Sequence, residues 1–261
     1  MKVKLGCFGF VRDIDLIRTA GYDTAEMDIY EINSQSKEEF KKTCSVARAS
    51  GLTFDAFSGF MPLTERIYKD VFQFENWLLY AEKAAVRTAG LGCRIWPFGC
   101  GKPRSIPLDI DGEKAKAKFK FFVEEICHII KKYGIVLAIE PLGPMNSNYL
   151  NYISETVKFV ESVNLENCMT MCDFRHMVKL NEGFDEIVKY RDYICHAHID
   201  NPCGMERRFP MVGDGVDYDG YLEALDRAGY DKILIVEATS YSNFEEEAKK
   251  TMEFFRLKGL K

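Results

Sequence analysis

The feature that most constrains the fold of this chain is a regular alternation of short apolar runs and longer segments with helical periodicity. Several helical segments end in a glycine that is followed by a hydrophobic residue: Gly21-Tyr22, Gly51-Leu52, Gly90-Leu91, Gly134-Ile135 and Gly229-Tyr230. Glycine suits the left-handed position that closes a helix, and the apolar residue after it begins the next strand. This alternation predicts a series of strand and helix units.

Eight strands are expected, at residues 2–8, 23–29, 52–58, 91–97, 135–140, 167–173, 193–199 and 232–237. A chain of 261 residues with 47% hydrophobic content matches one (β/α)₈ barrel, for which about 250 residues is typical. We therefore predict an α/β fold, a single (β/α)₈ TIM barrel, with one domain over residues 1–261. An open, doubly wound sheet is the competing fold, but the turn after the first strand, GCFGFVRD, lacks the G-x-G-x-x-G pattern.

Charge and cysteine content exclude several classes of protein. The formal net charge is -5 and the basic residues are scattered, which predicts no surface for a nucleic-acid backbone. The nine cysteines form no C-x-x-C pair and many lie inside apolar runs, as expected of reduced thiols. The first residues are too short an apolar stretch for a signal peptide, and nowhere do enough apolar residues run together to span a membrane. We expect a cytoplasmic protein without a membrane partner.

Four polar residues that can bind metal close apolar runs in the second half of the chain: Glu140, Asp173, His198 and Glu237. The carboxyl ends of barrel strands converge on one face, so these residues are expected to lie close together. Singly, a glutamate there is commonly an ion-pair partner and a histidine is commonly a hydrogen-bonded core residue. Four such residues on consecutive strands favour a shared site. Carboxylates with one imidazole suit one Mn²⁺, Mg²⁺ or Co²⁺ ion better than Zn²⁺.

Several ordered motifs carry a resemblance to a known superfamily: IEPLG at 139–143, CDFRH at 172–176, HAHID at 196–200, RRFP at 207–210, GDGVDYDGYLEAL at 213–225 and LIVEAT at 234–239. With them, the chain resembles the xylose-isomerase-like superfamily of sugar phosphate isomerases and epimerases. This superfamily includes ketose 3-epimerases, hydroxypyruvate isomerases and inosose dehydratases. The resemblance spans most of the chain and implies a (β/α)₈ barrel that carries one divalent ion.

The resemblance also implies roles for individual residues. It assigns the metal to Glu140, Asp173, His198 and Glu237. Glu140 and Glu237 would in addition act as the catalytic acid and base on the two faces of a substrate carbon, and His176 and Arg207 would contact substrate oxygens. A proton next to a carbonyl can be removed when the resulting enediolate is stabilised, which a divalent ion does as a Lewis acid. The expected function is metal-dependent isomerisation or epimerisation of a small sugar, sugar acid or sugar phosphate.

Three further residues are candidates near this site. Asn146 lies six residues after Glu140, where ketose 3-epimerases often carry a glutamate that binds terminal hydroxyls, so substrate contact is expected there but free-ketose specificity is not inherited. Glu26, in the second strand, is placed among the substrate-binding residues, with a structural ion pair as its alternative. His196 points to the same side of its strand as His198 and is expected to support the site from the core.

Two other functions remain open at this stage. The same ion and the same proton abstraction would serve a lyase or dehydratase that acts on a keto-sugar or keto-inositol. Apurinic endonucleases that act on DNA share the barrel, but resemblance to them would imply three zinc ions and more histidines than the four present. The expected partner is a small carbohydrate, and a homo-oligomer is left open.

Overall fold

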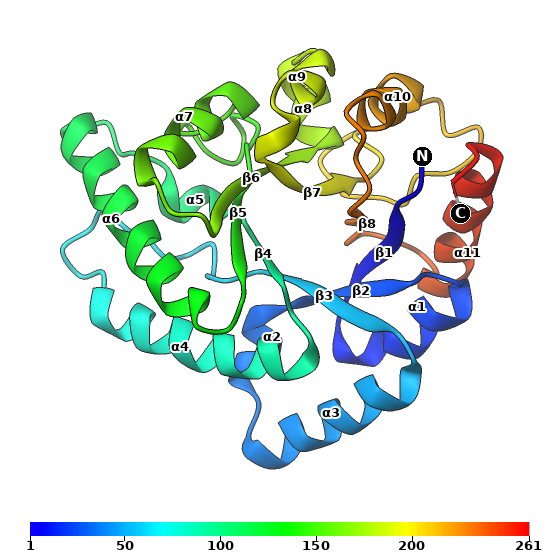
Figure 1. The fold of residues 1–261 in the computed structure, drawn as a ribbon, viewed down its shortest axis with the longest axis horizontal. Helices are drawn as coiled ribbons and strands as arrows, with labels where there is room; N and C mark the ends of the chain where they lie inside the picture. Colours follow the sequence, from blue (N-terminus) through cyan, green and yellow to red (C-terminus); the bar gives the residue numbers. More distant parts are fainter. Residues whose placement is uncertain (261) are drawn as a thin grey trace.

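The computed structural model describes residues 1–260, and in this part of the chain eight parallel strands follow one another around a closed barrel (Figure 1). The strands are β1 (Lys4–Gly9), β2 (Thr24–Asp28), β3 (Thr53–Ser58), β4 (Ile95–Phe98), β5 (Val136–Ile139), β6 (Cys168–Asp173), β7 (Ile194–Ile199) and β8 (Ile233–Val236). Each of the eight expected ranges overlaps one of them, and β1 and β4 each end one residue beyond the expected range. The predicted (β/α)₈ TIM barrel is confirmed.

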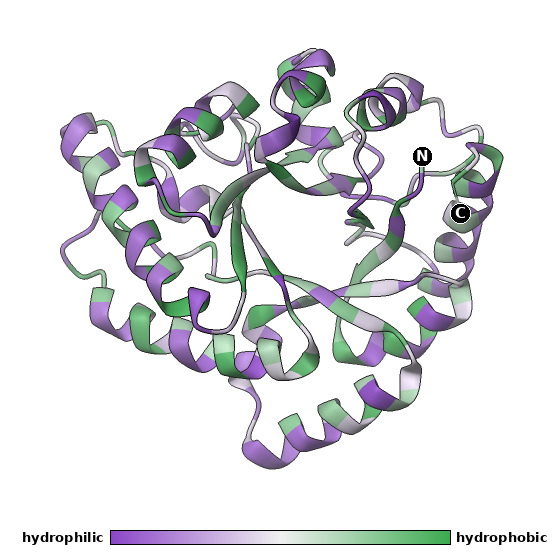
Figure 2. Ribbon diagram, viewed as in Figure 1, coloured by the Kyte–Doolittle hydropathy of each residue, from purple (hydrophilic) through white to green (hydrophobic). Residues whose placement is uncertain are grey.

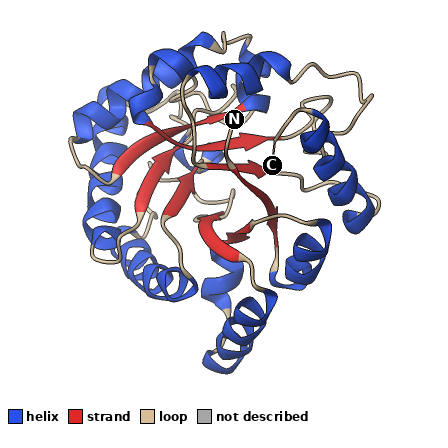
Figure 3. Cartoon of the chain, turned by 45° about the vertical axis from the view of Figure 1, so that its right-hand side comes forward, coloured by secondary structure: helices blue, strands red, loops and turns tan. Residues whose placement is uncertain are grey.

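Helices enclose the barrel on its outside (Figure 3). They are α1 (Ile14–Ala20), α2 (Ile29–Ser34), α3 (Lys37–Ser50), α4 (Phe74–Leu91), α5 (Gly101–Arg104), α6 (Gly112–Lys131), α7 (Ile153–Val163), α8 (Phe174–Leu180), α9 (Asp185–Lys189), α10 (Asp219–Arg227) and α11 (Phe244–Leu257), with short 3₁₀ helices at Val11–Asp13 and Arg191–Tyr193. Within residues 1–260, none of these helices combines the length and the apolar character that crossing a membrane requires.

The glycines that end the helices behave as predicted, with one exception. Four of the five have positive φ angles: Gly21, Gly51, Gly134 and Gly229. The prediction for Gly90 is wrong, because α4 continues to Leu91 and is closed by Gly92, whose φ is 108° and whose N–H donates to carbonyls of the last turn. As a result β4 begins at Ile95 and not at residue 91.

Alternation along each strand divides the apolar residues between two cores. Leu234 and Val236 of β8 join the main core between strands and helices, whereas Ile233 and Ile235 form a separate small cluster with Phe8. Since successive strand residues point to opposite faces, this second set fills the inside of the barrel. Figure 2 shows the largely hydrophobic strands and the mixed, more polar helices.

The register of the last four strands brings their carboxyl ends to the same face of the barrel, with β6, β7 and β8 ending at nearly the same level. Asp173 of β6 is paired with His198 of β7, and Ile199 of β7 is paired with Val236 of β8. Ile139, the last residue of β5, is paired with Thr170 of β6. Residues that end or directly follow these strands therefore meet at one face of the barrel, where barrel enzymes place their active sites.

Candidate metal and substrate site

The structure brings the four predicted metal ligands together at the carboxyl ends of β5 to β8. One ligand atom from each of Glu140, Asp173, His198 and Glu237 lies within 4.8 Å of the others. Glu140, Asp173 and His198 are buried, and the side chain of Glu237 is 18% exposed. Their convergence follows from strand order and register. Their binding of a metal stays a prediction.

The carboxylate of Asp173 is held in place by the helix that follows it. Its Oδ1 accepts a hydrogen bond of 2.9 Å from the backbone N–H of His176 and caps α8. An N-cap of this kind uses one oxygen and fixes the side chain. The other oxygen, Oδ2, lies 3.1 Å from Arg207 and 3.8 Å from Nδ1 of His198. Strand β6 therefore delivers one carboxylate oxygen to the site.

Glu140 fits into space that Gly99 leaves open, because a Cβ atom on Gly99 would overlap Oε2 of Glu140. The buried Arg104 donates a hydrogen bond of 2.8 Å to the backbone carbonyl of Glu140 and fixes the chain there. Oε1 of Glu140 is buried and has no hydrogen-bond partner among residues 1–260. Burial, together with the charges of Glu237 and Asp173, raises the pKa of Glu140 to about 8. An unpartnered carboxylate oxygen that faces other carboxylates fits a bound cation.

His198 lies between two carboxylates. Its Nδ1 is 2.9 Å from Oε2 of Glu237, and its Nε2 is 3.1 Å from Oε2 of Glu26. Burial alone would disfavour the imidazolium, but Glu26 and Glu237 raise the pKa of His198 well above its usual value. Three carboxylates and one imidazole nitrogen form the hard, oxygen-rich donor set that suits Mn²⁺, Mg²⁺ or Co²⁺. The residues present therefore fit a single divalent ion.

Arg207 places a positive charge among these carboxylates. Its Nη1 lies 2.8 Å from Glu237 and 3.1 Å from Asp173, and its Nη2 lies 3.0 Å from Nε2 of His176. Coulomb attraction is strong in a poorly solvated site, so the guanidinium offsets much of the repulsion between the acidic groups. Arg207 was predicted to contact substrate, and its position next to both the predicted ligands and His176 is compatible with that role.

Sequence reasoning did not reveal a buried ion pair, Arg175 with Asp200, that fixes the segment carrying Arg207. Asp200, fully buried after β7, accepts a hydrogen bond of 2.8 Å from Nε of Arg175. Arg175 also donates to the backbone carbonyls of the following segment: Asn201, Pro202, Gly204 and Glu206. Burial raises the pKa of Asp200 to about 7, although Arg207 and Arg175 oppose the shift. Both residues lie within the quoted motifs, but no local pattern links them.

His176 presents one ring nitrogen to the site. Its Nδ1 accepts a hydrogen bond of 3.1 Å from the backbone N–H of Gly143. Burial lowers the pKa of His176 to about 4, so the ring is neutral near pH 7 and carries its proton on Nε2. Nε2 lies 3.5 Å from Oε1 of Glu140. His176 is therefore a neutral hydrogen-bond donor that faces the predicted ligands.

A cavity of about 260 Å³ opens above these groups. Its lining includes five of the predicted residues already described and also Asn146. The cavity is also lined by residues for which no role was predicted, among them Asp28, Ser58, Met61, Lys102 and Leu142. A larger, more open hollow of about 620 Å³ between α6 and α7 contains none of the predicted site residues.

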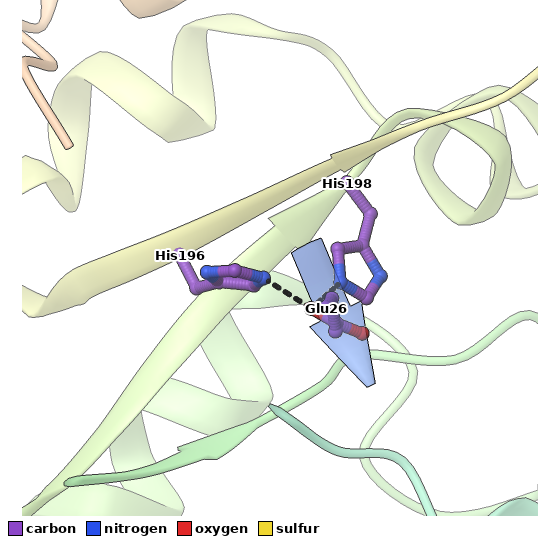
Figure 4. A group of neighbouring side chains, drawn as sticks. All are labelled: Glu26, His196 and His198. Atoms are coloured by element: carbon purple, nitrogen blue, oxygen red, sulfur yellow. Dashed lines mark hydrogen bonds and ion pairs between the residues drawn. The ribbon is translucent and has the colours of Figure 1, made fainter. Parts of the chain in front are cut away.

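Glu26, which was predicted among the substrate-binding residues, does not line this cavity. Its side chain is fully buried, and Oε2 lies 2.9 Å from Nε2 of His196 and 3.1 Å from Nε2 of His198 (Figure 4). Asp28, two residues later on the same face of β2, lines the cavity instead. Glu26 lies one layer deeper in the barrel, because alternate strand residues point to the same side at successive heights. The expected alternative, an ion pair in the interior, is what the structure contains.

Comparison with known proteins places this barrel in a family. Residues 14–258 match the family described as the xylose isomerase-like TIM barrel. The chain belongs to this family. A ketose 3-epimerase of Arthrobacter globiformis is 24% identical over 258 residues, which cover 92% of this chain and 85% of that protein.

Solved structures share the same barrel fold. A D-psicose 3-epimerase, crystallised in the presence of D-fructose, superposes with a TM-score of 0.83 at 19% identity, and covers 98% of this chain and 99% of its own. The IolI protein with a bound zinc atom superposes with a TM-score of 0.77 at 18% identity over 96% of each chain. At these identities the likeness establishes the fold.

Proposed function

We propose that this protein is a divalent-metal-dependent isomerase or epimerase of a small sugar, sugar acid or sugar phosphate. The observation that carries the proposal is the convergence of three carboxylates and one imidazole within 4.8 Å at the carboxyl end of the barrel, beside a cavity. The similarity to a ketose 3-epimerase over 92% of the chain supports the same reaction class.

Glu140 and Glu237 are proposed to move the proton. Both line the cavity and directly follow strands β5 and β8, so a substrate carbon between them would present one face to each carboxylate. A group that moves a proton must lie within reach of the substrate carbon, and both Glu140 and Glu237 face the cavity. One carboxylate then accepts the proton while the other returns one to the opposite face.

His176 and Arg207 are proposed to bind a substrate oxygen. Nε2 of His176 and Nη2 of Arg207 lie 3.0 Å apart, and both carry hydrogen when Nδ1 accepts from Gly143. Two donors cannot satisfy each other, so a substrate oxygen between them would receive both hydrogen bonds. The ion held by the four ligands would supply Lewis-acid polarisation of the substrate carbonyl.

The cavity limits the substrate to a small molecule. Its volume of about 260 Å³ lies just below the range of about 300 to 1,000 Å³ that is typical of ligand pockets. The rim carries the neutral amide of Asn146 and the ammonium of Lys102. Neither would repel an acidic substrate group, which keeps sugar acids and sugar phosphates in the proposed class beside neutral sugars.

The proposal is tested by deuterium incorporation from D₂O. Metal-stripped protein reconstituted with Mn²⁺ is incubated with a panel of ketoses, aldoses, sugar acids and sugar phosphates, and products are followed by NMR and mass spectrometry. We expect exchange next to the carbonyl of at least one substrate, and its loss in Glu140→Gln and Glu237→Gln. Glu245→Gln, on the surface of α11, is the matched control. Exchange that persists in both active-site variants would contradict the roles assigned, and a product lighter by one water would indicate elimination.

A further inference from the structure

Beneath the proposed metal ligands, Glu26, His196 and His198 form a buried group that the proposed reaction does not use directly. In Figure 4 the two histidines project from β7 and Glu26 approaches them from β2. The two strands are not neighbours in the barrel, so Glu26 spans its interior. One oxygen, Oε2, contacts both rings, at 2.9 Å from Nε2 of His196 and 3.1 Å from Nε2 of His198.

The chemistry of these contacts determines which nitrogen of His198 faces the cavity. An ionised carboxylate oxygen can only accept, so the ring nitrogens that face Oε2 carry hydrogen. With Nε2 of His198 committed to Glu26, Nδ1 is left on the side of Glu237 and Asp173, at 2.9 and 3.8 Å from their oxygens. Nδ1 is therefore the nitrogen that an ion at the four ligands would bind, in place of the proton that otherwise lies between Nδ1 and Glu237.

We infer that Glu26 is the positioning residue of the metal centre: it fixes the ring orientation of His198 and reserves Nδ1 for the ion. This inference rests on the proposed metal-dependent function. A histidine that binds metal commonly donates its other N–H to a carboxylate, which orients the ring and strengthens the ligand. The backbone of His198 is anchored separately, since its carbonyl accepts a hydrogen bond of 3.0 Å from Tyr221. Glu26 controls the ring itself.

A second ion bound by Glu26, His196 and His198 is the competing interpretation, because one atom of each lies within 4.8 Å of the others. Two observations favour hydrogen bonds. The facing atoms are already at hydrogen-bond distances, and neither Glu26 nor His196 lines the cavity through which an ion would enter. The two interpretations differ in stoichiometry, with one ion per chain in the first and two in the second.

The decisive experiment measures Co²⁺ and Mn²⁺ binding to the metal-stripped protein by calorimetry. Loss of a carboxylate behind a metal-binding histidine typically weakens metal binding by about 10- to 100-fold. We expect a loss near the upper end of that range for Glu26→Leu and a smaller loss for Glu26→Gln, whose amide oxygen can still accept from His198. The matched control is His196→Phe, which removes the other partner of Glu26 and leaves its bond to His198. Metal affinity should change little in this control.

Two further measurements separate positioning from a merely structural role. Urea unfolding of the metal-free variants gives their stability, and a structural role predicts that metal affinity falls in proportion to stability in all three. Proton NMR of the Co²⁺ form should contain one shifted, solvent-exchangeable signal from Nε2–H of His198, retained in His196→Phe and lost in Glu26→Leu. Unchanged affinity in both Glu26 variants, two ions per chain, or no such signal in the unmodified protein would overturn the inference.

The outcome is distinguishable from failure of the proposed function. If the unmodified protein binds no ion at the four ligands, both ideas fail. If it binds one ion whose affinity is independent of Glu26, only the positioning role fails. If affinity depends on Glu26 but no sugar exchanges a proton with solvent, the positioning role stands and the proposed reaction fails.

Discussion

Replacing Glu140 by glutamine is expected to stabilise the metal-free protein at neutral pH. The folded chain keeps Glu140 protonated up to about pH 8, whereas the unfolded chain releases that proton near the ordinary pKa of 4.5. At a pH between these two pKa values, the chain must therefore take up a proton when it folds, which costs free energy. Glutamine resembles the protonated acid in shape and has no proton to take up.

The size of the effect follows from the same two pKa values. At pH 7 the solution is roughly 2.5 pH units above the ordinary pKa of 4.5, and at about 1.4 kcal/mol for each unit the cost is about 3 kcal/mol. Because Glu140 is buried, solvent does not screen this term. The free energy of unfolding of the unmodified protein, relative to that of Glu140→Gln, therefore falls as pH rises from 4.5 to 8.

The assay is urea unfolding in the presence of a chelator, followed by tryptophan fluorescence. The two proteins should have nearly equal free energies of unfolding at pH 4.5 and differ by about 3 kcal/mol at pH 7, with the variant more stable. Glu245→Gln, which removes an exposed charge, controls for the change in net charge. A Glu140→Gln protein that is equally or less stable at pH 7 would refute the reasoning that burial and acidic neighbours keep this carboxyl protonated.

Three further predictions concern the same face of the barrel. Gly99→Ala should displace the carboxylate of Glu140 and weaken Mn²⁺ binding in calorimetry, whereas Gly90→Ala, where the added Cβ meets nothing within 4 Å, should not. Arg175→Met should destabilise the fold by about 3 to 5 kcal/mol in urea, because it leaves the buried Asp200 without its closest cation. Protons compete with an ion for Glu140, so Mn²⁺ affinity measured by calorimetry should rise about tenfold for each pH unit up to about pH 8.

Different outcomes would contradict each of these. Normal Mn²⁺ affinity in Gly99→Ala would mean that the carboxylate of Glu140 can bind the ion without the space that Gly99 leaves open. Wild-type stability of Arg175→Met would mean that the segment after β7 is held by its remaining contacts. A flat pH dependence of Mn²⁺ affinity would mean that Glu140 is already ionised without metal.

The positions of the four proposed ligands could be predicted because barrel geometry converts strand ends into neighbours. Glu140, Asp173, His198 and Glu237 each close an apolar run, and the structure places them within 4.8 Å of one another. The start of the fourth strand was harder to predict. Two glycines, Gly90 and Gly92, are equally good helix terminators by composition, and only the backbone hydrogen bonds of the last turn select the second.

Depth within the barrel could not be obtained from the sequence. Glu26 and Asp28 are two residues apart in β2 and point to the same side of the strand, but only Asp28 lines the cavity. Which layer a residue occupies depends on the stagger between strands, and a single sequence does not report it. Arg175 was missed for a related reason, since its partners are Asp200 and carbonyls about thirty residues away.

The measurement that tests the central claim most directly is anomalous diffraction from crystals of the protein loaded with Mn²⁺. The account predicts one strong peak per chain, enclosed by Glu140, Asp173, His198 and Glu237, and no peak between Glu26 and His196. A peak elsewhere, several peaks in the barrel, or none at these four residues in crystals saturated with Mn²⁺ would contradict it.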